Sequence, residues 1–249
     1  MLAPGRDKCN RDSTGGAAPV VGYSSDMQAT KRPRVKICCI SSHEEATLAI
    51  DHGAAALGLV YAMPSGPGVI SEPLIAEIAA RVPPPVATFL LTARQDAMAI
   101  IEQHHRCRTS TIQIVDRLTQ GCYDDLRRAL PGISIVQVVH VVGEESVDEA
   151  ALLAEHVDAI LLDSGNLALA TKELGGTGRR HDWSLSRRIR EKIAIPVFLA
   201  GGLNPGNVRQ AVDEVGPFAL DICTGVRSDG KLDAEKLGAL FTSLDAICA

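Results

Sequence analysis

Aromatic residues are scarce in this chain, since Phe, Tyr and Trp make up only 3% of its 249 residues. Long apolar runs are missing too. No segment reaches the roughly 20 apolar residues of a membrane span, and residues 1–33 contain no apolar region of the signal-peptide kind. The formal net charge is −5 and no basic stretch occurs, which argues against a nucleic-acid-binding surface. We therefore expect a cytoplasmic protein whose partners include neither a membrane nor a nucleic acid.

The cysteines form no recognisable motif. Their number is odd, no CxxC pair is present, and no zinc-ligand spacing occurs. We expect reduced thiols and no metal site. The seven residues are Cys9, Cys38, Cys39, Cys107, Cys122, Cys223 and Cys248.

Aliphatic residues must build the core, because the chain is 46% hydrophobic with so few aromatics. Such a core suits a parallel sheet that is buried on both faces. From Val35 onward, short apolar runs alternate with stretches of helical periodicity, a pattern typical of βαβ units. We predict strands near residues 35–40, 56–61, 85–91, 111–115, 133–140, 158–163, 195–200 and 218–222, and helices near 43–53, 72–82, 94–105, 121–130, 147–156, 183–193, 205–214 and 233–247.

Eight such repeats predict an α/β protein with a closed, parallel eight-stranded (β/α)₈ TIM barrel, formed by residues 34–249. An open, doubly wound sheet is the alternative, but no GxGxxG sequence follows the first strand. Residues 1–33 are rich in Gly, Pro, Ser and charge and lack periodicity. We expect them to form a flexible N-terminal extension.

Two loops near the end of the chain favour phosphate binding. The active site of such a barrel lies at the carboxyl ends of its strands, and phosphate commonly binds at the loops after strands 7 and 8. Gly201 and Gly202, ahead of a helix that opens at Asn204, offer unobstructed N–H donors. Thr224 and Gly225 add a hydroxyl and further amides after strand 8. A tight turn explains the paired glycines equally well, but the two loops together favour phosphate.

Cys38 and Asp163 are the candidate acid–base residues. Cys38 ends the first strand, where nearby positive charge, for example from Lys36, can convert a thiol into a proton acceptor; a small buried hydrophobe is the other interpretation. Asp163 ends an apolar strand, where its pKa can rise enough for general acid work. The other interpretation is an Asp that binds its own loop amides.

Further candidates lie at other strand ends. Asp116 and His140 follow adjacent strands and form either a proton shuttle or two unrelated loop residues. Asp221 ends the eighth strand. Arg179 lies in a Gly-rich loop ahead of the sixth helix, which can act as a lid with this residue aimed at an anion.

These residues carry a resemblance to the phosphoribosylanthranilate isomerase family of tryptophan biosynthesis. The resemblance covers roughly residues 34–248, and the order and spacing of its motifs agree with the family. The matching motifs are Lys36-Ile37-Cys38, Leu161-Leu162-Asp163, residues 175–178 with Asp182-Trp183, residues 201–205 with Asn207-Val208, and Asp221 with Thr224-Gly225-Val226.

The resemblance implies a barrel of the ribulose-phosphate-binding type and an aldose–ketose isomerase. Cys38 would be the general base and Asp163 the general acid of an Amadori rearrangement, which converts an N-linked ribose 5-phosphate into a 1-amino-1-deoxyketose 5-phosphate. It implies a phosphorylated small-molecule substrate, no cofactor, and a monomer or homodimer.

Three departures stand against that pattern. Cys39 replaces the family's Gly after the base. Residues 64–68 hold no cation where the family has an Arg for the anthranilate end, so Arg94 and Arg227 become candidates to replace it. On strand 4, Gln113-Ile114-Val115 stands where the family has Gln-Leu-His. Two alternatives therefore stay open. One is an isomerase or lyase that acts on another phosphorylated sugar through Asp116 and His140, and the other is a catalytically silent phosphate-ligand binder.

Overall fold

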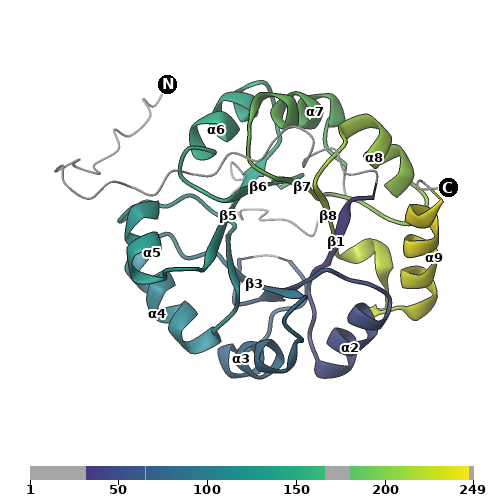
Figure 1. The fold of residues 1–249 in the computed structure, drawn as a ribbon, viewed down its shortest axis with the longest axis horizontal. Coiled ribbons are helices and arrows are strands. Elements are labelled where there is room, and N and C mark those ends of the chain that lie inside the picture. Colours follow the sequence, from purple (N-terminus) through teal and green to yellow (C-terminus); the bar gives the residue numbers. More distant parts are fainter. Residues whose placement is uncertain (1–31, 65, 166–179, 247–249) are drawn as a thin grey trace.

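The computed structural model describes residues 32–64, 66–165 and 180–246. Eight parallel strands form a closed barrel in sequence order, and the first strand pairs with both the second and the eighth (Figure 1). The predicted barrel is therefore confirmed. Its strands are β1 (Arg34–Ile37), β2 (Ala56–Val60), β3 (Ala87–Thr92), β4 (Thr111–Ile114), β5 (Ser134–His140), β6 (Ala159–Asp163), β7 (Val197–Leu199) and β8 (Ala219–Ile222).

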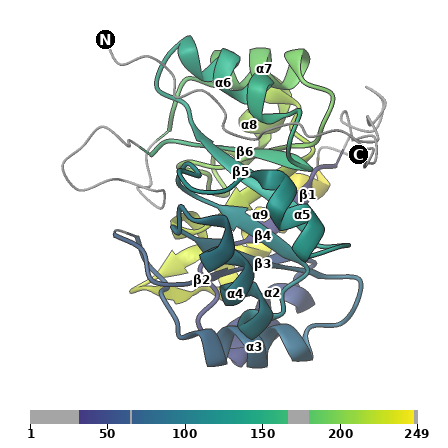
Figure 2. The same ribbon diagram turned by 90° about the vertical axis from the view of Figure 1, so that its left-hand side faces the viewer.

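Helices surround this ring on every side, and a side view shows them packed along its outer wall (Figure 2). None of the helices within the described ranges is long and apolar enough to cross a membrane. They are α2 (His43–Asp51), α3 (Glu72–Arg81), α4 (Ala97–Cys107), α5 (Tyr123–Ala129), α6 (Glu145–Leu153), α7 (Trp183–Lys192), α8 (Val208–Val215) and α9 (Ala234–Asp245).

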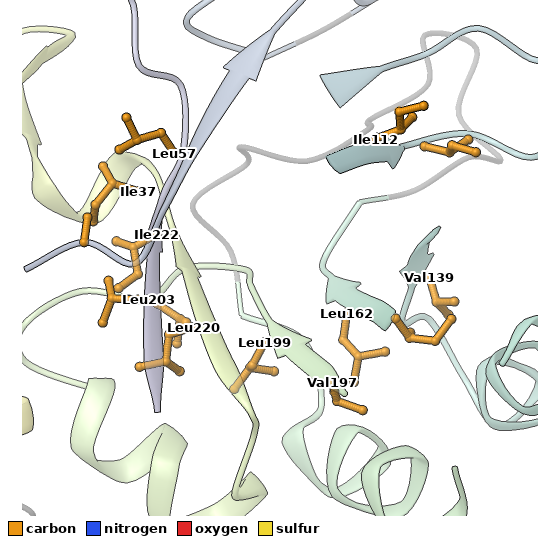
Figure 3. Close-up of a cluster of buried hydrophobic side chains, with 14 of the residues drawn as sticks. Ile37, Leu57, Ile112, Val139, Leu162, Val197, Leu199, Leu203, Leu220 and Ile222 are labelled. Atoms are coloured by element: carbon orange, nitrogen blue, oxygen red, sulfur yellow. The ribbon is translucent and has the colours of Figure 1, made fainter. Parts of the chain in front are cut away.

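The buried core consists of two clusters, because side chains alternate between the two faces of each strand. Successive strand residues point to opposite faces. On β6, Ile160 and Leu162 belong to the large cluster between barrel and helices, whereas Leu161 belongs to the smaller cluster inside the barrel. Figure 3 shows Leu162 in the outer cluster beside Val197, Leu199 and Leu220. The same parity aims Asp163 into the barrel mouth.

Polar caps start several of the helices. Ser42, Ser71, Asp96 and Asp233 each accept a hydrogen bond from the first turn of the following helix, which satisfies N–H groups that the helix leaves free. Other boundaries differ from the prediction. The predicted helix 205–214 begins only at Val208, because the residues before it form the loop described below.

The first strand is also shorter than predicted. It ends at Ile37, and Cys39 has a φ of +64°, in the left-handed region that a β-branched or bulky residue avoids. The chain therefore leaves the barrel wall at Cys38 and Cys39. The pattern analysis also missed a short hairpin after β8, which consists of a 3₁₀ turn (Thr224–Val226), β9 (Arg227–Ser228) and β10 (Lys231–Leu232).

Candidate active site

The carboxyl ends of the strands bring Cys38, Asp163, Gly202 and Gly225 to one end of the barrel. Cys38 and Asp163 are 125 residues apart in the sequence. They reach the same end because all strands run in the same direction. Within the described residues, no cluster of three or more His, Cys, Asp or Glu side chains is arranged to hold a metal ion.

A buried ion pair lies beneath the mouth. Lys36 is fully buried, and its Nζ donates to Asp221 Oδ1 at 2.7 Å across the β1–β8 pairing. Burial by itself lowers the pKa of Lys36, but the Asp221 carboxylate more than offsets this and raises it above its ordinary value. The pair therefore supplies a permanently charged ammonium inside the barrel.

Gly58 leaves the space that the Cys38 thiol occupies. A Cβ at this position on β2 would lie 2.9 Å from Cys38 Sγ, closer than real Cβ atoms come, and 3.1 Å from Lys36 Nζ, a tight contact. The thiol and the ammonium thus share the space that the missing side chain leaves. Our sequence analysis overlooked Gly58, although a Gly inside an apolar strand signals a close approach.

Asp163 combines burial with few hydrogen bonds. Its side chain is 8% exposed and accepts from the Ser164 N–H at 2.7 Å. Burial raises the pKa of the Asp163 carboxyl and the Asp221 carboxylate adds to this, while the Ser164 N–H and His140 act in the opposite direction. The net rise favours a protonated carboxyl at the edge of the mouth, which is the form a general acid needs.

His140 and Gln113 present unsatisfied groups. His140 pairs in register with Asp163, and its Nε2 lies 3.1 Å from the Val115 carbonyl oxygen, so this nitrogen donates. Its Nδ1 and the Oε1 of Gln113 are buried without a hydrogen-bond partner among the described residues. Asp116 caps its own loop by accepting from the Arg117 N–H at 2.8 Å. His140 is thus tied to the neighbouring backbone and lies beside Asp163.

The loops after β7 and β8 leave several N–H groups free. Gly201 and Gly202 have φ values of 83° and 65°, which only Gly adopts readily. In the described structure, the N–H groups of Gly201, Gly202 and Gly225 have no acceptor. Gly225 also lies so close to the β7 loop that any Cβ there would collide with the Leu203 carbonyl oxygen. The two loops therefore form one surface of backbone donors.

Asn204, a predicted phosphate-binding residue, makes its hydrogen bonds within its own loop. Its N–H donates to Asn207 Oδ1 at 2.9 Å, and its own Oδ1 accepts from the Gly206 N–H at 2.9 Å. The side chains of Asn204 and Asn207 also both donate to the Gly202 carbonyl oxygen. Asn204 is therefore occupied in fixing the glycine loop, because all its polar groups are used within it.

Arg227, one candidate to replace the missing cation, is held by other groups. Arg227 is buried and donates to Glu45 at 2.8 Å and to the Cys38 carbonyl oxygen at 3.2 Å. This brace between the β1 and β8 loops went unnoticed in the sequence.

The Arg94 guanidinium lies 5.7 Å from the ring centre of Tyr61, in the loop after β2, and it also interacts with Glu72 on α3. Its Nε is buried without a hydrogen-bond partner among the described residues. Arg227 is thus engaged elsewhere, whereas Arg94 lies beside the loop that lacks the cation. Arg179, the remaining candidate, lies outside the described residues.

Comparisons with known proteins agree with this geometry. Residues 35–243 match the family model for N-(5'-phosphoribosyl)anthranilate (PRA) isomerase. The chain is 34% identical over 206 residues to N-(5'-phosphoribosyl)anthranilate isomerase 2 of Methanosarcina mazei, covering 82% of this chain and 90% of the relative.

Solved structures give the same result. The phosphoribosyl anthranilate isomerase of Thermotoga maritima is 29% identical with a TM-score of 0.72, covering 86% of this chain and 99% of that one. A second similar structure, 27% identical with a TM-score of 0.70 and a coverage of 86% and 99%, is a phosphoribosyl anthranilate isomerase in complex with reduced 1-(o-carboxyphenylamino)-1-deoxyribulose 5-phosphate.

Proposed function

The chain belongs to the phosphoribosylanthranilate isomerase family, and we propose that it catalyses the Amadori rearrangement of phosphoribosylanthranilate in tryptophan biosynthesis, in the cytoplasm. One observation carries the proposal. A buried carboxyl with a raised pKa, a thiol beside a buried ammonium, and a surface of free backbone N–H groups lie at one end of one barrel.

Asp163 starts the reaction as the general acid. The raised pKa of Asp163 keeps a proton on the carboxyl to higher pH than usual. That proton goes to the ring oxygen of the ribose, the C1–O bond breaks, and the nitrogen lone pair forms the C=N bond of a Schiff base. The protonated Schiff base is itself the electron sink for the next step.

Cys38 acts as the base. Its thiolate takes the proton from C2, and the C–H electrons form the enolamine, which becomes the 1-amino-1-deoxyketose. The ammonium of Lys36 interacts favourably with a charged Cys38 thiol. Because Asp221 fixes that ammonium in place, no reorganisation is needed when the thiolate forms.

The phosphate would bind at the loops after β7 and β8. The free N–H groups of Gly201, Gly202 and Gly225 are donors for a charged oxygen, and the Thr224 hydroxyl lies on the same surface. These donors are backbone groups on fixed loops, so they position the substrate without losing side-chain entropy.

One observation favours the alternative of a different phosphorylated sugar. The sequence of residues 61–70 contains no Lys or Arg, and Arg227 is held by Glu45. The carboxyphenyl group of the ligand in the related structure would therefore meet no cation from the loop after β2 itself.

A steady-state assay tests the proposal. The full-length protein is mixed with phosphoribosylanthranilate, and the loss of anthranilate-type fluorescence is followed against Cys38→Ala and Asp163→Asn variants. Turnover that both variants lose supports the proposal. Turnover of another phosphorylated sugar instead would support the divergent enzyme, and phosphate binding without any turnover would support a silent binder.

A further inference from the structure

Cys39 and Cys223 lie next to each other although 184 residues separate them. Their sulfur atoms are 2.7 Å apart, not far beyond the roughly 2.05 Å of a disulfide bond. Cys39 follows β1 and Cys223 follows β8, the two strands that close the barrel. We propose that these two thiols form a reversible disulfide that joins the base loop to the phosphate loop.

The two thiols differ in a way that suits this reaction. Cys39 is buried, and its contact with Cys223 raises the pKa of its thiol well above its ordinary value. Cys223 is partly exposed, and the same contact together with the Arg227 guanidinium lowers the pKa of its thiol despite burial. Cys223 is therefore the thiolate that an oxidant reaches, and Cys39 is the thiol that closes the bond.

Hydrogen peroxide is an oxidant small enough to reach the partly exposed Cys223. The Cys223 thiolate attacks the O–O bond, which gives a sulfenic acid and releases hydroxide. The Cys39 sulfur then attacks the Cys223 sulfur, and water leaves with the sulfenic oxygen. In total, two thiols and one peroxide give one disulfide and two waters. A dithiol reductant reverses the bond by exchange.

Strain at Cys39 adds to the case. This residue has a φ of +64°, and the loop after β2 packs directly on it, because a Cβ at Gly68 would lie 2.5 Å from the Cys39 Cβ. A thiol held in this conformation has little freedom to turn away from Cys223, so closing the bond costs little further entropy. Of the other described cysteines, Cys38 precedes Cys39 in the chain, and Cys107 and Cys122 lie on or beside the outer helices α4 and α5.

The disulfide would affect catalysis through its neighbours. Cys38 precedes Cys39, and Thr224 and Gly225 follow Cys223. Joining the loops moves the base and the phosphate donors together. A displacement of about 1 Å in a reacting group costs up to about 10²-fold, so we expect the oxidised enzyme to turn over about 10- to 100-fold more slowly. This second part rests on the proposed function, whereas the bond itself does not.

Peptide mapping tests the bond. Trypsin should release residues 37–81 joined to residues 210–227 from peroxide-treated protein, and reduction should separate them. The Cys38→Ala variant should still give the joined peptides, which excludes a bond through Cys38. Cys39→Gly, which suits the positive φ, and Cys223→Ser should give none. Joined peptides that disappear in Cys38→Ala, or oxidation only to sulfinic acid, would overturn the proposal.

An activity measurement separates the formation of the disulfide from its proposed effect on turnover. Wild-type protein should lose turnover in dilute peroxide and regain it in a dithiol, whereas Cys39→Gly should keep its turnover far longer. Equal rates of inactivation in both proteins would contradict the regulatory role. If the joined peptides form but the reduced protein turns over no phosphoribosylanthranilate, the bond stands and the proposed function fails.

Discussion

The phosphate loops (residues 201–204 and 223–225) and loop 2 (residues 61–64 and 66–70) lie on either side of the β1 loop at the barrel mouth but offer a substrate different things. The phosphate loops present backbone N–H groups whose positions are fixed by positive φ values and by the contact between Gly225 and Leu203. Loop 2 presents no cation and packs its Gly68 on Cys39.

The difference shows which kind of recognition persists when side chains change. Backbone donors depend on loop conformation, and here Asn204 and Asn207 hold that conformation through hydrogen bonds within the loop. A side-chain cation depends on one residue identity. The phosphate side is therefore recognisable in the sequence, whereas the loop 2 side carries the departures.

Removing the acid or the base should have the largest effect. We expect Cys38→Ala and Asp163→Asn each to lower kcat by about 10²–10⁴-fold, the usual contribution of general acid or base catalysis. Stopped assays with the purified variants measure it. Cys39→Gly is the matched control for loss of a neighbouring thiol and should keep its kcat when reduced. A loss below about threefold in a folded variant, within the scatter of such measurements, would make the residue structural.

The brace beneath the phosphate side should contribute most to stability. Arg227→Met removes the cation that pairs with the largely buried Glu45 carboxylate. The variant should lose about 3–5 kcal/mol of unfolding free energy. Urea unfolding measures the change. The exposed pair Arg187–Glu191 provides the control, since Arg187→Met should change the free energy by about 0.5 kcal/mol or less. Equal losses for the two variants would show that the buried pair adds nothing.

This stabilisation should depend on pH in a defined direction. Burial alone would raise the pKa of Glu45, but the Arg227 guanidinium outweighs it and lowers the pKa below 4.5. A lowered folded-state pKa means that the stabilisation is present above pH 4.5 and is lost as the pH falls through the lowered value. The difference in unfolding free energy between wild type and Glu45→Gln should shrink over that range, and a constant difference would contradict the assignment.

A change in the phosphate loops should weaken anion binding by an intermediate amount. Gly202→Val strains a φ of 65° and shields the N–H donors. A hydrogen bond to a charged group contributes roughly 1.5–3 kcal/mol, so affinity for ribose 5-phosphate should fall about 10- to 150-fold in calorimetry. Gly132→Val is the control, because its φ of 84° is similar and its Cβ meets no atom within 4 Å. Unchanged affinity in folded Gly202→Val would place the phosphate elsewhere.

Adding a cation to loop 2 should have a smaller effect, on kcat/KM for phosphoribosylanthranilate. Pro67 is exposed, and Pro67→Arg should raise kcat/KM for phosphoribosylanthranilate by up to about 10-fold through a charge-assisted hydrogen bond to the carboxylate. Gly68→Arg should fail, because its φ is 75° and its Cβ would collide with Cys39. If wild type already turns this substrate over near about 10⁶ M⁻¹s⁻¹, another residue does the work of the missing Arg.

The smallest effect is a shift in pH dependence. His140 lowers the pKa of Asp163, so His140→Gln should raise it further. Since the acid must be protonated, the alkaline limb of the kcat profile should move to higher pH. The limb is measured in the reduced enzyme, where disulfide formation does not contribute. A shift to lower pH would contradict the assignment of Asp163 as the acid.

The sequence by itself determined the architecture and the end of the barrel that holds the site. Short apolar runs, helical periodicity and glycine-rich loops act over a few positions, so they are visible locally. In a parallel barrel, Cys38 and Asp163 then share one end because each follows or ends a strand. The glycine loops are visible for the same local reason.

Only the tertiary structure decided which side chains meet. Cys39 contacts Cys223 and Glu45 pairs with Arg227 because β1 closes on β8, a contact between residues more than 180 positions apart. The pairing of β2 with β1 likewise sets Gly58 against the Cys38 thiol, which β2 alone does not reveal. Side-chain partners depend on the closed ring rather than on neighbours along the chain, and no local pattern records that geometry.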